Sequence, residues 1–557
     1  MRSLVAKSAL FSAAVFAVAC SRGHARPSSA GDAAIEPPPC GCPPAPAAAR
    51  FDPNAARFTA APSEKAMTVL LDAEPPSLMP FLRPDWLSWM VIGHLVQESL
   101  VRVDARRGVL VPELAEKWEV DETHTRWTFH LRHGVTWHDG VPFTADDVIF
   151  TFDRLLDPQV GAPDRVLFSG ARVTKTGAFD VEVKLRAPLA AAELDFDRLL
   201  ILSRHRSPRG DLAHSPDATA PVGTGPMRFG SWTRGARIEL ARSGAYWGTP
   251  APVASLTFRF PPSHAALLAT VDASDFDVVP RATGDMVERV ERDQDLRARY
   301  SVIRAAGANY TAWIHNVASP KLRDPRVRRA IGLSIPRDVL RCEIERCNVG
   351  VAIGPLPPGH PALSGLGAPS FDPKAAAKEL DAAGILDHDA DGRRELDGVP
   401  LVLRLIYPSS SHDHERSASV VADELRRIGV TLELTPLEWA QFLRQLQNHD
   451  FELAAIEWTI DSEPDLFPLF HSTQVAGSLN YGAYASPEVD GWLDELRQER
   501  PAARRAELLH EVVTRLRRDE PYTFLFSPLT MAIARRGTRA ISPTPLGWEP
   551  RAWAWEP

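Results

Sequence analysis

The chain has 557 residues, of which 44% are hydrophobic and 24% charged, so it holds enough apolar material for large cores. This length is typical of roughly two to four domains. The formal net charge of -8 comes from acidic and basic residues that are well mixed, which argues against the basic stripe of a nucleic-acid-binding protein.

Residues 1–19 have the three parts of a secretory signal peptide: the basic residues Arg2 and Lys7, the apolar run SALFSAAVFAVA, and small residues before a cleavage point. The apolar run is shorter than the roughly twenty residues that span a bilayer. Cys20 follows directly, in a context that resembles a bacterial lipobox, although Ala17 stands where leucine is commoner. Cys20 is therefore expected to carry lipid; the alternative is ordinary cleavage nearby that leaves it unmodified.

Residues 20–65 are rich in Pro, Ala, Gly and Ser and show no apolar periodicity, which predicts a disordered tether. A lipid anchor and a tether imply a body that works outside the cytoplasm, near a membrane surface. Cys40 and Cys42 lie in this tether, and the sequence leaves open whether they pair, stay free or bind a metal weakly. Cys342 and Cys347, near a predicted helix end, are expected to form a short disulfide, because export permits disulfides. None of these spacings matches a structural zinc site.

The stretch TFHLRHGVTWHDGVPFTADDV, residues 128–148, concentrates histidines and aspartates. The alternation in RWTFHLR predicts a half-buried strand with His130 on its polar face. Asp-Gly at 139–140 predicts a tight turn, and Thr144 with Asp147 predicts a capping box that opens a helix. Each acidic residue has a structural role and the histidines share no helical face, so this stretch is interpreted as scaffold and not as a metal site.

The same stretch, preceded by VPELAEKWEV, resembles the signature of the family-5 extracellular solute-binding proteins, the oligopeptide and dipeptide receptors of bacterial ABC importers. Further segments resemble that family in the same order: ESLVRVD, PVGTGPMRFGSW, NVASPKLRDPRVRRAIGLSIPRDVL, IGPLPPGHPAL, AAGILDHDADGRRELDGVPLVLRLIYP and LNYGAYASPEVDGWLDE. The resemblance runs from about Thr68 to the C-terminus.

The later part of the chain alternates predicted strands and helices: PLVLRLIYP, HERSASVVADELRRIG, VTLELTPL, WAQFLRQLQN and FELAAIEW. This order predicts an α/β layer. The resemblance implies the class II, Venus-flytrap fold of periplasmic binding proteins, with two lobes and an extra small domain. Carried over, lobe I takes residues 66–100, 216–305 and 526–557, the small domain residues 101–215, and lobe II residues 306–525.

The resemblance also implies a ligand site in a cleft that closes by hinge motion. Trp458 and Asp461 match the family's Trp-x-x-Asp, in which the aspartate commonly pairs with the ligand ammonium. Asn480 and Tyr481 match a segment that lines the cleft. The alternative from the residues alone is that Asp461 caps a turn, Trp458 is core, and Asn480 and Tyr481 pack a loop. Met79 and Ala455 depart from the family pattern and leave the ligand open among peptides, metal complexes, opines and sugars.

Other motifs favour structural interpretations. Asp387, Asp389 and Asp391 resemble the start of a calcium loop, but Gly398 stands where a bidentate glutamate belongs. HDH at 412–414 and RVRR at 326–329 are expected to be solvated helical positions. No catalytic motif, metal site or cofactor site is predicted. The expected partners are a peptide or similar small polar solute and separate permease and ATPase chains, and the protein itself is expected to be a monomer. The rival hypotheses are a secreted hydrolase, and a receptor fold used as a sensor or adhesion partner.

Overall fold

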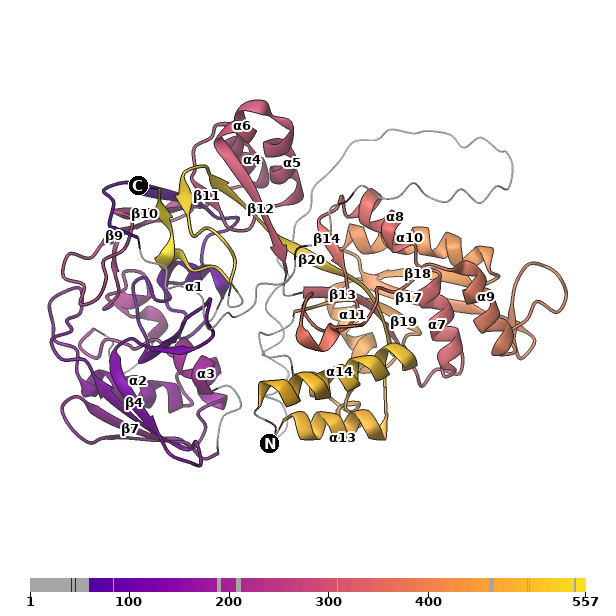
Figure 1. The fold of residues 1–557 in the computed structure, drawn as a ribbon, viewed down its shortest axis with the longest axis horizontal. Coiled ribbons are helices and arrows are strands. Elements are labelled where there is room, and N and C mark those ends of the chain that lie inside the picture. The colour runs from indigo at the N-terminus through magenta and orange to yellow at the C-terminus, as the bar shows by residue number, and fades with distance from the viewer. Residues whose placement is uncertain are drawn as a thin grey trace. The chain divides into compact units, whose positions relative to one another are not determined.

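The computed structural model describes residues 42, 46, 60–83, 85–187, 192–206, 212–307, 309–459, 465–497, 499, 501–544 and 547–556. The predicted signal peptide, Cys20, Cys40 and Asp461 lie outside the described residues. The described chain forms two compact units: unit 1 takes residues 42, 46 and 305–529, and unit 2 takes the described residues from 60 to 304 and from 530 onward. The boundaries fall inside two strands, β12 (Tyr300–Ala306) and β20 (Tyr522–Arg535), which run through both units (Figure 1).

Unit 2 contains a sheet of order β20-β11-β1-β10-β9-β8, in which β1 is parallel to its two neighbours and the other pairs are antiparallel. A second, antiparallel sheet has the order β4-β5-β7-β6. Each sheet lies over its own hydrophobic core. The elements are β1 (Ala66–Leu70), α1 (Trp86–Ile92), β2 (Val101–Val103), β3 (Leu110–Pro112), β4 (Ala115–Val120), β5 (Arg126–Leu131), α2 (Ala145–Leu156), β6 (Arg172–Lys175), β7 (Asp180–Lys184), α3 (Ala192–Arg198), β8 (Met227–Thr233), β9 (Arg237–Arg242), β10 (Ser255–Arg259), α4 (His264–Asp272), β11 (Val278–Val279), α5 (Gly284–Arg292), α6 (Gln294–Arg299), β21 (Thr538–Arg539) and β22 (Ala554–Trp555).

The histidine- and aspartate-rich stretch forms the predicted strand and helix in unit 2. Strand β5 alternates buried and partly exposed side chains, and Thr144 and Asp147 form both halves of a capping box at the start of α2. His130 Nδ1 lies 2.6 Å from Asp180 Oδ1 on β7, whereas His138 Nε2 lies 2.9 Å from the carbonyl oxygen of Gly225. These histidines therefore bind separate structural partners.

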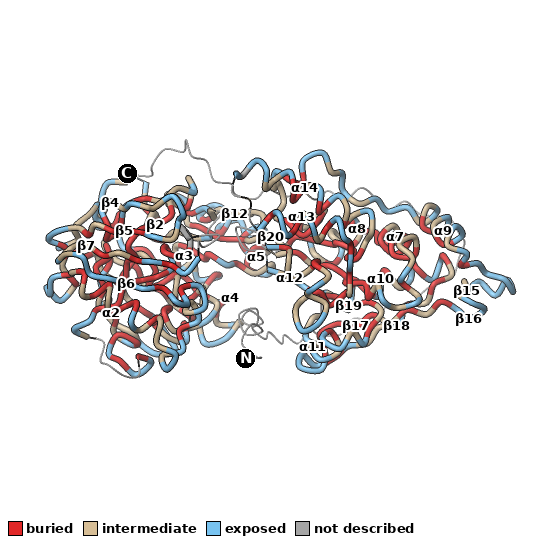
Figure 2. The backbone as a smooth tube through the Cα atoms, turned by 90° about the horizontal axis from the view of Figure 1, so that it is seen from below, coloured by how far each residue is buried: buried red, intermediate tan, exposed pale blue. Residues whose placement is uncertain are grey.

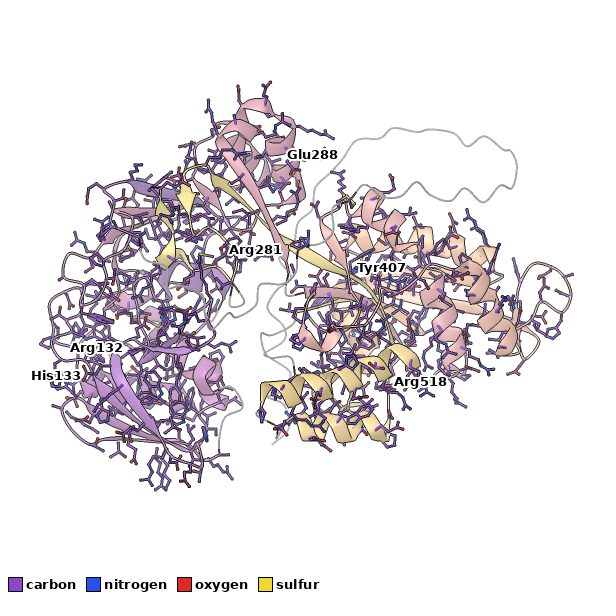
Figure 3. The ribbon with its side chains drawn as sticks, viewed as in Figure 1. Arg132, His133, Arg281, Glu288, Tyr407 and Arg518 are labelled. Carbon is purple, nitrogen blue, oxygen red and sulfur yellow. A yellow bond between two sulfur atoms is a disulfide. The ribbon has the colours of Figure 1, made fainter. Side chains whose placement is uncertain are left out.

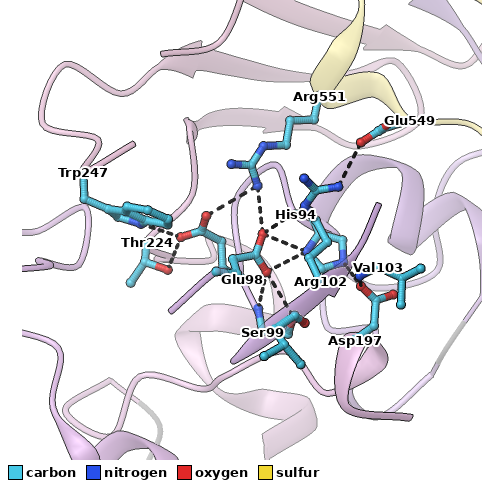
Figure 4. Close-up of polar contacts among 12 residues, drawn as sticks. His94, Glu98, Ser99, Arg102, Val103, Asp197, Thr224, Trp247, Glu549 and Arg551 are labelled. Carbon is cyan, nitrogen blue, oxygen red and sulfur yellow. Dashed lines mark hydrogen bonds and ion pairs between the residues drawn. The ribbon is translucent and has the colours of Figure 1, made fainter. Parts of the chain in front are cut away.

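A network of charged side chains lies in the interior of unit 2 (Figure 4). His94 Nδ1 lies 2.9 Å from Glu113 Oε2, and Arg551 from the C-terminal segment donates to Glu113 Oε1 at 2.8 Å. Glu98 accepts hydrogen bonds from Thr224, Tyr246 and Trp247 and lies 3.5 Å from Arg551. Charges are costly to bury unless they are paired. Each of these residues therefore depends on partners from distant segments, and the network ties those segments of unit 2 together.

Unit 1 is built on a sheet of order β18-β17-β19-β13-β20, with β14 also paired to β20. Helices α7, α9 and α10 contribute to the core on one face, and α11, α13 and α14 to the core on the other (Figure 1). Buried residues run along the strands, whereas the tip that carries β15 and β16 is exposed (Figure 2). The elements are β13 (Asn309–His315), α7 (Pro325–Leu333), α8 (Arg337–Val339), η5 (Leu340–Ile344), β14 (Val349–Val351), α9 (Pro373–Ala382), β15 (Glu395–Leu396), β16 (Val399–Pro400), β17 (Val402–Pro408), α10 (His412–Arg427), β18 (Thr431–Leu437), α11 (Trp439–Gln447), β19 (Leu453–Thr459), α12 (Phe467–Phe470), α13 (Pro487–Leu496) and α14 (Ala502–Asp519).

The cysteine pairing differs from the prediction. Cys347 forms its disulfide with Cys42, 305 positions away, and not with Cys342 (Figure 3). Cys342 lies inside η5, which ends at Ile344, and Arg346 and Cys347 then adopt positive φ values of 48° and 62°. The prediction of a Cys342–Cys347 bridge is therefore wrong. It assumed that nearby cysteines pair, but a bridge depends on close, properly directed Cβ atoms and not on sequence spacing.

The RVRR segment is also less solvated than expected. Arg328 on α7 is only 5% exposed, and its guanidinium donates to the carbonyl oxygens of Leu322, Arg323 and Asp519. Arg329 pairs instead with Glu379 at 2.9 Å. Among the described residues, the helices are too short or too polar to cross a membrane.

Candidate ligand-binding site

The carboxyl ends of three strands meet at one edge of the unit 1 sheet. Strand β17 is parallel to both β18 and β19, and β17 and β18 end opposite each other at Pro408 and Leu437. Tyr407, one residue before the end of β17, is buried (Figure 3). Strand β13 runs the other way, so that Asn309 at its start lies opposite Thr459 at the end of β19. Since ligands of open α/β sheets bind outside the carboxyl ends of the strands, this edge favours a binding site.

Trp458 and Tyr481 form an aromatic wall at this edge. The half-buried indole of Trp458 stacks on the ring of Tyr481, with ring centroids 6.2 Å apart and an angle of 18° between the planes. His449 holds the backbone of Tyr481, because its Nδ1 lies 2.8 Å from the Tyr481 carbonyl oxygen. The structure thus brings together two of the four residues that the sequence predicts as ligand contacts.

Two buried tyrosines that the sequence analysis did not select lie beside Trp458. Tyr310 is its register partner on β13, and the Tyr522 hydroxyl lies near the indole N–H without forming a hydrogen bond of normal geometry. Among the described residues, Tyr310 Oη, Tyr522 Oη and Trp458 Nε1 have no hydrogen-bond partner. Burial raises the pKa of both tyrosines, so both hydroxyls stay protonated. No local pattern marks these residues, because strand pairing alone brings them to Trp458.

Asn480 supports the wall from within its loop. Its side-chain amide donates to the carbonyl oxygens of His471 and Tyr484 at 3.1 and 2.8 Å, and its Oδ1 accepts from the Tyr484 N–H at 3.1 Å. The amide therefore holds the loop that presents Tyr481. A direct ligand contact by Asn480 stays a prediction.

Asp461 follows the last residue of β19 by two positions and lies outside the described residues. Its role as a ligand carboxylate stays a prediction. The chain order places it just past the carboxyl end of the strand that carries Trp458.

Acidic side chains line the same edge on the opposite face of the sheet. Glu457 precedes Trp458 and so points to the other face, where it accepts a hydrogen bond from Asn309 Nδ2 at 2.6 Å. Burial raises the pKa of Glu345 to about 7, and the charges of Asp413 and Glu457 add to this effect. This acidic group is therefore separate from the aromatic wall.

The aspartates of the calcium-like loop hold the loop itself. The side-chain oxygens of Asp387, Asp389 and Asp391 lie within 4.8 Å of one another, and all three residues are exposed. Each accepts a backbone N–H from the loop: Asp387 from Gly392 at 3.0 Å, Asp389 from Asp391 at 3.2 Å, and Asp391 from Arg393 at 2.8 Å. These bonds give the loop a structural explanation without an ion.

Comparison with known proteins gives the family. Residues 109–478 match the family model of the bacterial extracellular solute-binding proteins, family 5. The oligopeptide-binding protein AppA of Bacillus subtilis is 25% identical over 456 residues, which cover 78% of this chain and 81% of AppA. The dipeptide-binding protein of Escherichia coli is 25% identical and covers 88% of this chain and 95% of its own length.

Solved structures agree with this result. The structure of AppA in complex with a nonapeptide superposes with a TM-score of 0.66 at 21% identity, covering 89% of this chain and 100% of AppA. NikA from Brucella suis in complex with Fe(III)-EDTA superposes with a TM-score of 0.74 at 22% identity, covering 88% of this chain and all of NikA. These likenesses confirm the predicted two-lobed α/β fold, and the chain belongs to the family-5 bacterial extracellular solute-binding proteins.

Proposed function

We propose that this protein is the lipid-anchored, extracytoplasmic binding component of an ABC importer, and that it captures peptides and delivers them to a membrane permease. The observation that carries the proposal is the wall of Trp458 and Tyr481 at the carboxyl edge of the unit 1 sheet, with three buried polar atoms beside it that find no hydrogen-bond partner in the described part of the chain. Relatives that bind oligopeptides and dipeptides support peptides as the ligand class.

The chemistry of the wall suits a peptide. An extended peptide offers main-chain N–H and C=O groups at regular spacing, so a site that binds the backbone tolerates many side chains. The flat rings of Trp458 and Tyr481 cover apolar ligand surface. The hydroxyls of Tyr310 and Tyr522 are buried in this structure, and they would donate to ligand carbonyl groups once the side chains that cover them move aside. Asp461 would receive the free ammonium group, and its charge would act strongly where the ligand excludes water.

Closure follows from binding and needs no chemical step. In the body of the protein the chain passes between the units in β12 and β20, so few backbone torsions there have to change for the units to move; a third crossing lies after residue 48. A ligand that contacts both units stabilises the closed arrangement by the difference between its affinities for the two states. In this proposal the ligand leaves the protein unchanged.

The test is calorimetric titration of the purified protein with a peptide library, after native mass spectrometry has identified any ligand that co-purifies. We expect saturable binding of peptides with a free amino terminus. Asp461→Ala should weaken this binding by at least tenfold, since a desolvated ion pair is lost. N-acetylated peptides should bind the wild type as weakly as free peptides bind the variant.

Asp423→Ala is the matched control, because Asp423 is an exposed carboxylate on α10 that pairs with Arg426 three positions on. It should leave peptide affinity unchanged. Binding of a metal chelate in place of peptides would assign the protein to another ligand class within the family, as the NikA complex illustrates. Turnover of the added peptides would contradict a pure binding role and favour the hydrolase hypothesis.

A further inference from the structure

The Cys42–Cys347 disulfide changes where the N-terminal segment is attached to the body. By sequence, that segment leads into unit 2, where the Ser63 N–H donates to the Pro252 carbonyl oxygen and β1 pairs with β10 along Ala66–Leu70. The disulfide fixes Cys42 instead to unit 1, with the two Cα atoms 5.3 Å apart. Everything that precedes Cys42 is therefore attached first to unit 1.

Backbone hydrogen bonds hold Cys347 and its neighbours in place on unit 1. The Cys347 N–H donates to the Arg341 carbonyl oxygen at 2.9 Å, and the Asn348 N–H donates to Glu345 at 2.8 Å. The Asn348 carbonyl oxygen in turn accepts from the N–H of Leu529, the last residue of β20 that belongs to unit 1. Cys347 thus lies beside the strand that crosses to unit 2.

A second cysteine of the same segment also forms a disulfide. Cys342 is also disulfide-bonded, and its sulfur lies 3.9 Å from that of Cys42. Since Cys347 is already bonded to Cys42, the segment 340–347 of unit 1 contributes two cysteines to two different bridges.

We propose that these cysteines make unit 1, the unit with the aromatic wall, the anchored half of the protein, and leave unit 2 as the half that moves. That the tether ends in a lipid at Cys20 rests on the proposed function, whereas the attachment of Cys42 to unit 1 is independent of it.

Formation of the Cys42–Cys347 disulfide is a two-electron oxidation and needs an oxidant. The thiols of Cys42 and Cys347 lose two protons and two electrons, and these reduce the disulfide of an exported thiol oxidoreductase to its dithiol. Export supplies such catalysts, whereas a reducing compartment would leave the thiols free.

Peptide mapping tests the pairing directly. Trypsin cuts after Arg341 and Arg346, so it separates Cys342 from Cys347, and it cuts after Arg50 beyond Cys42. Without reductant, we expect the peptide 347–374 to be linked to the peptide that contains Cys42. A direct link between 342–346 and 347–374 without the Cys42 peptide, or free thiols with bound zinc in the native mass, would overturn the proposal.

A cleavage assay tests the attachment. The full chain carries Cys20→Ser, an affinity tag after His24 and a specific protease site between Pro53 and Asn54, which removes any dependence on lipid or ligand. After cleavage without reductant, the tag should stay with unit 1 and the body should remain bound to the affinity resin; reductant should release it.

The double variant Cys342→Ser/Cys347→Ser is the control, because it removes both bridges on unit 1. Its body should elute after cleavage without reductant. Release of the unreduced parent protein would contradict the attachment to unit 1. Peptide binding measured on the same preparations reports separately on the proposed function.

Discussion

Arg551 donates to Glu113 at 2.8 Å, although 438 positions separate them along the chain. Glu113 is 1% exposed and also contacts His94 at 2.9 Å (Figure 4). The C-terminal segment thus supplies the cation that a carboxylate near the start of unit 2 requires. Unit 2 is therefore complete only when both of its chain segments, before β12 and after β20, are in place.

Arg551→Met should destabilise unit 2 strongly. It keeps most of the side-chain volume but removes the arginine that contacts both Glu113 and Glu98 and leaves Glu113 with Arg102 at 3.7 Å. Breaking a buried pair by removing one partner costs about 3 kcal/mol or more. Urea unfolding followed by tryptophan fluorescence measures the change. Arg237→Met is the control: its pair with Glu239 is about half exposed and should contribute less than about 1 kcal/mol. Equal effects of the two variants would contradict the role of the network.

The same network should make the protein more stable at mildly acidic pH than at alkaline pH. Burial alone would lower the pKa of His94, but Glu113 and Asp197 outweigh it and raise this pKa to about 10. The stability from His94 is thus fully present below its unfolded pKa of about 6.5 and is lost as the pH rises toward 10. Burial and Glu113 likewise raise the pKa of Glu98 to about 7, so its contribution also falls with rising pH.

Glu113 determines where the network loses stability at low pH. Burial would raise its pKa, but His94 and Arg551 lower it to about 2, so its contribution is present above about 4.5 and is lost toward pH 2. The free energy of unfolding should therefore be larger at pH 6 than at pH 9 and should fall again below pH 4. Urea midpoints across this range give the profile. His94→Gln should reduce the difference between pH 6 and pH 9; an identical profile in the variant would remove His94 as its cause.

Gly223 should tolerate no side chain. A Cβ there would lie 1.6 Å from the Val96 carbonyl oxygen, because the Gly-Thr-Gly turn passes directly against that backbone. Backbone cannot yield as a side chain can, so Gly223→Ala should cost more than about 3 kcal/mol and lower the melting temperature sharply. Gly244→Ala is the control, since a Cβ at this exposed position meets nothing within 4 Å. A Gly223→Ala variant as stable as the control would contradict this packing.

Local patterns predicted the elements well, because their signals lie within a few residues. The alternation in RWTFHLR became β5, the capping box of Thr144 and Asp147 became the start of α2, and PLVLRLIYP became β17. The order of strands and helices in unit 1 follows in the same way from apolar periodicity.

Interactions between distant segments were not predictable in this way. Nothing near Cys347 points to Cys42, nothing near Glu113 points to Arg551, and Tyr310 meets Trp458 only through the pairing of β13 with β19. The family resemblance selected Trp458 and Tyr481, but the two tyrosines beside them became visible only in the folded sheet.

Tyr522→Phe should weaken peptide binding without lowering the stability of the fold. The Tyr522 hydroxyl is buried and has no hydrogen-bond partner among the described residues, so removing it should leave the free energy of unfolding unchanged or raise it by about 1 kcal/mol. If the hydroxyl donates to a ligand carbonyl group, the same change should weaken peptide binding several-fold, as measured by calorimetry. Tyr484→Phe is the control: its hydroxyl already donates to Asp519 at 2.7 Å, so its loss should reduce stability without changing affinity. A Tyr522→Phe variant that unfolds more easily but binds peptides normally would show that the hydroxyl serves the fold and not the ligand.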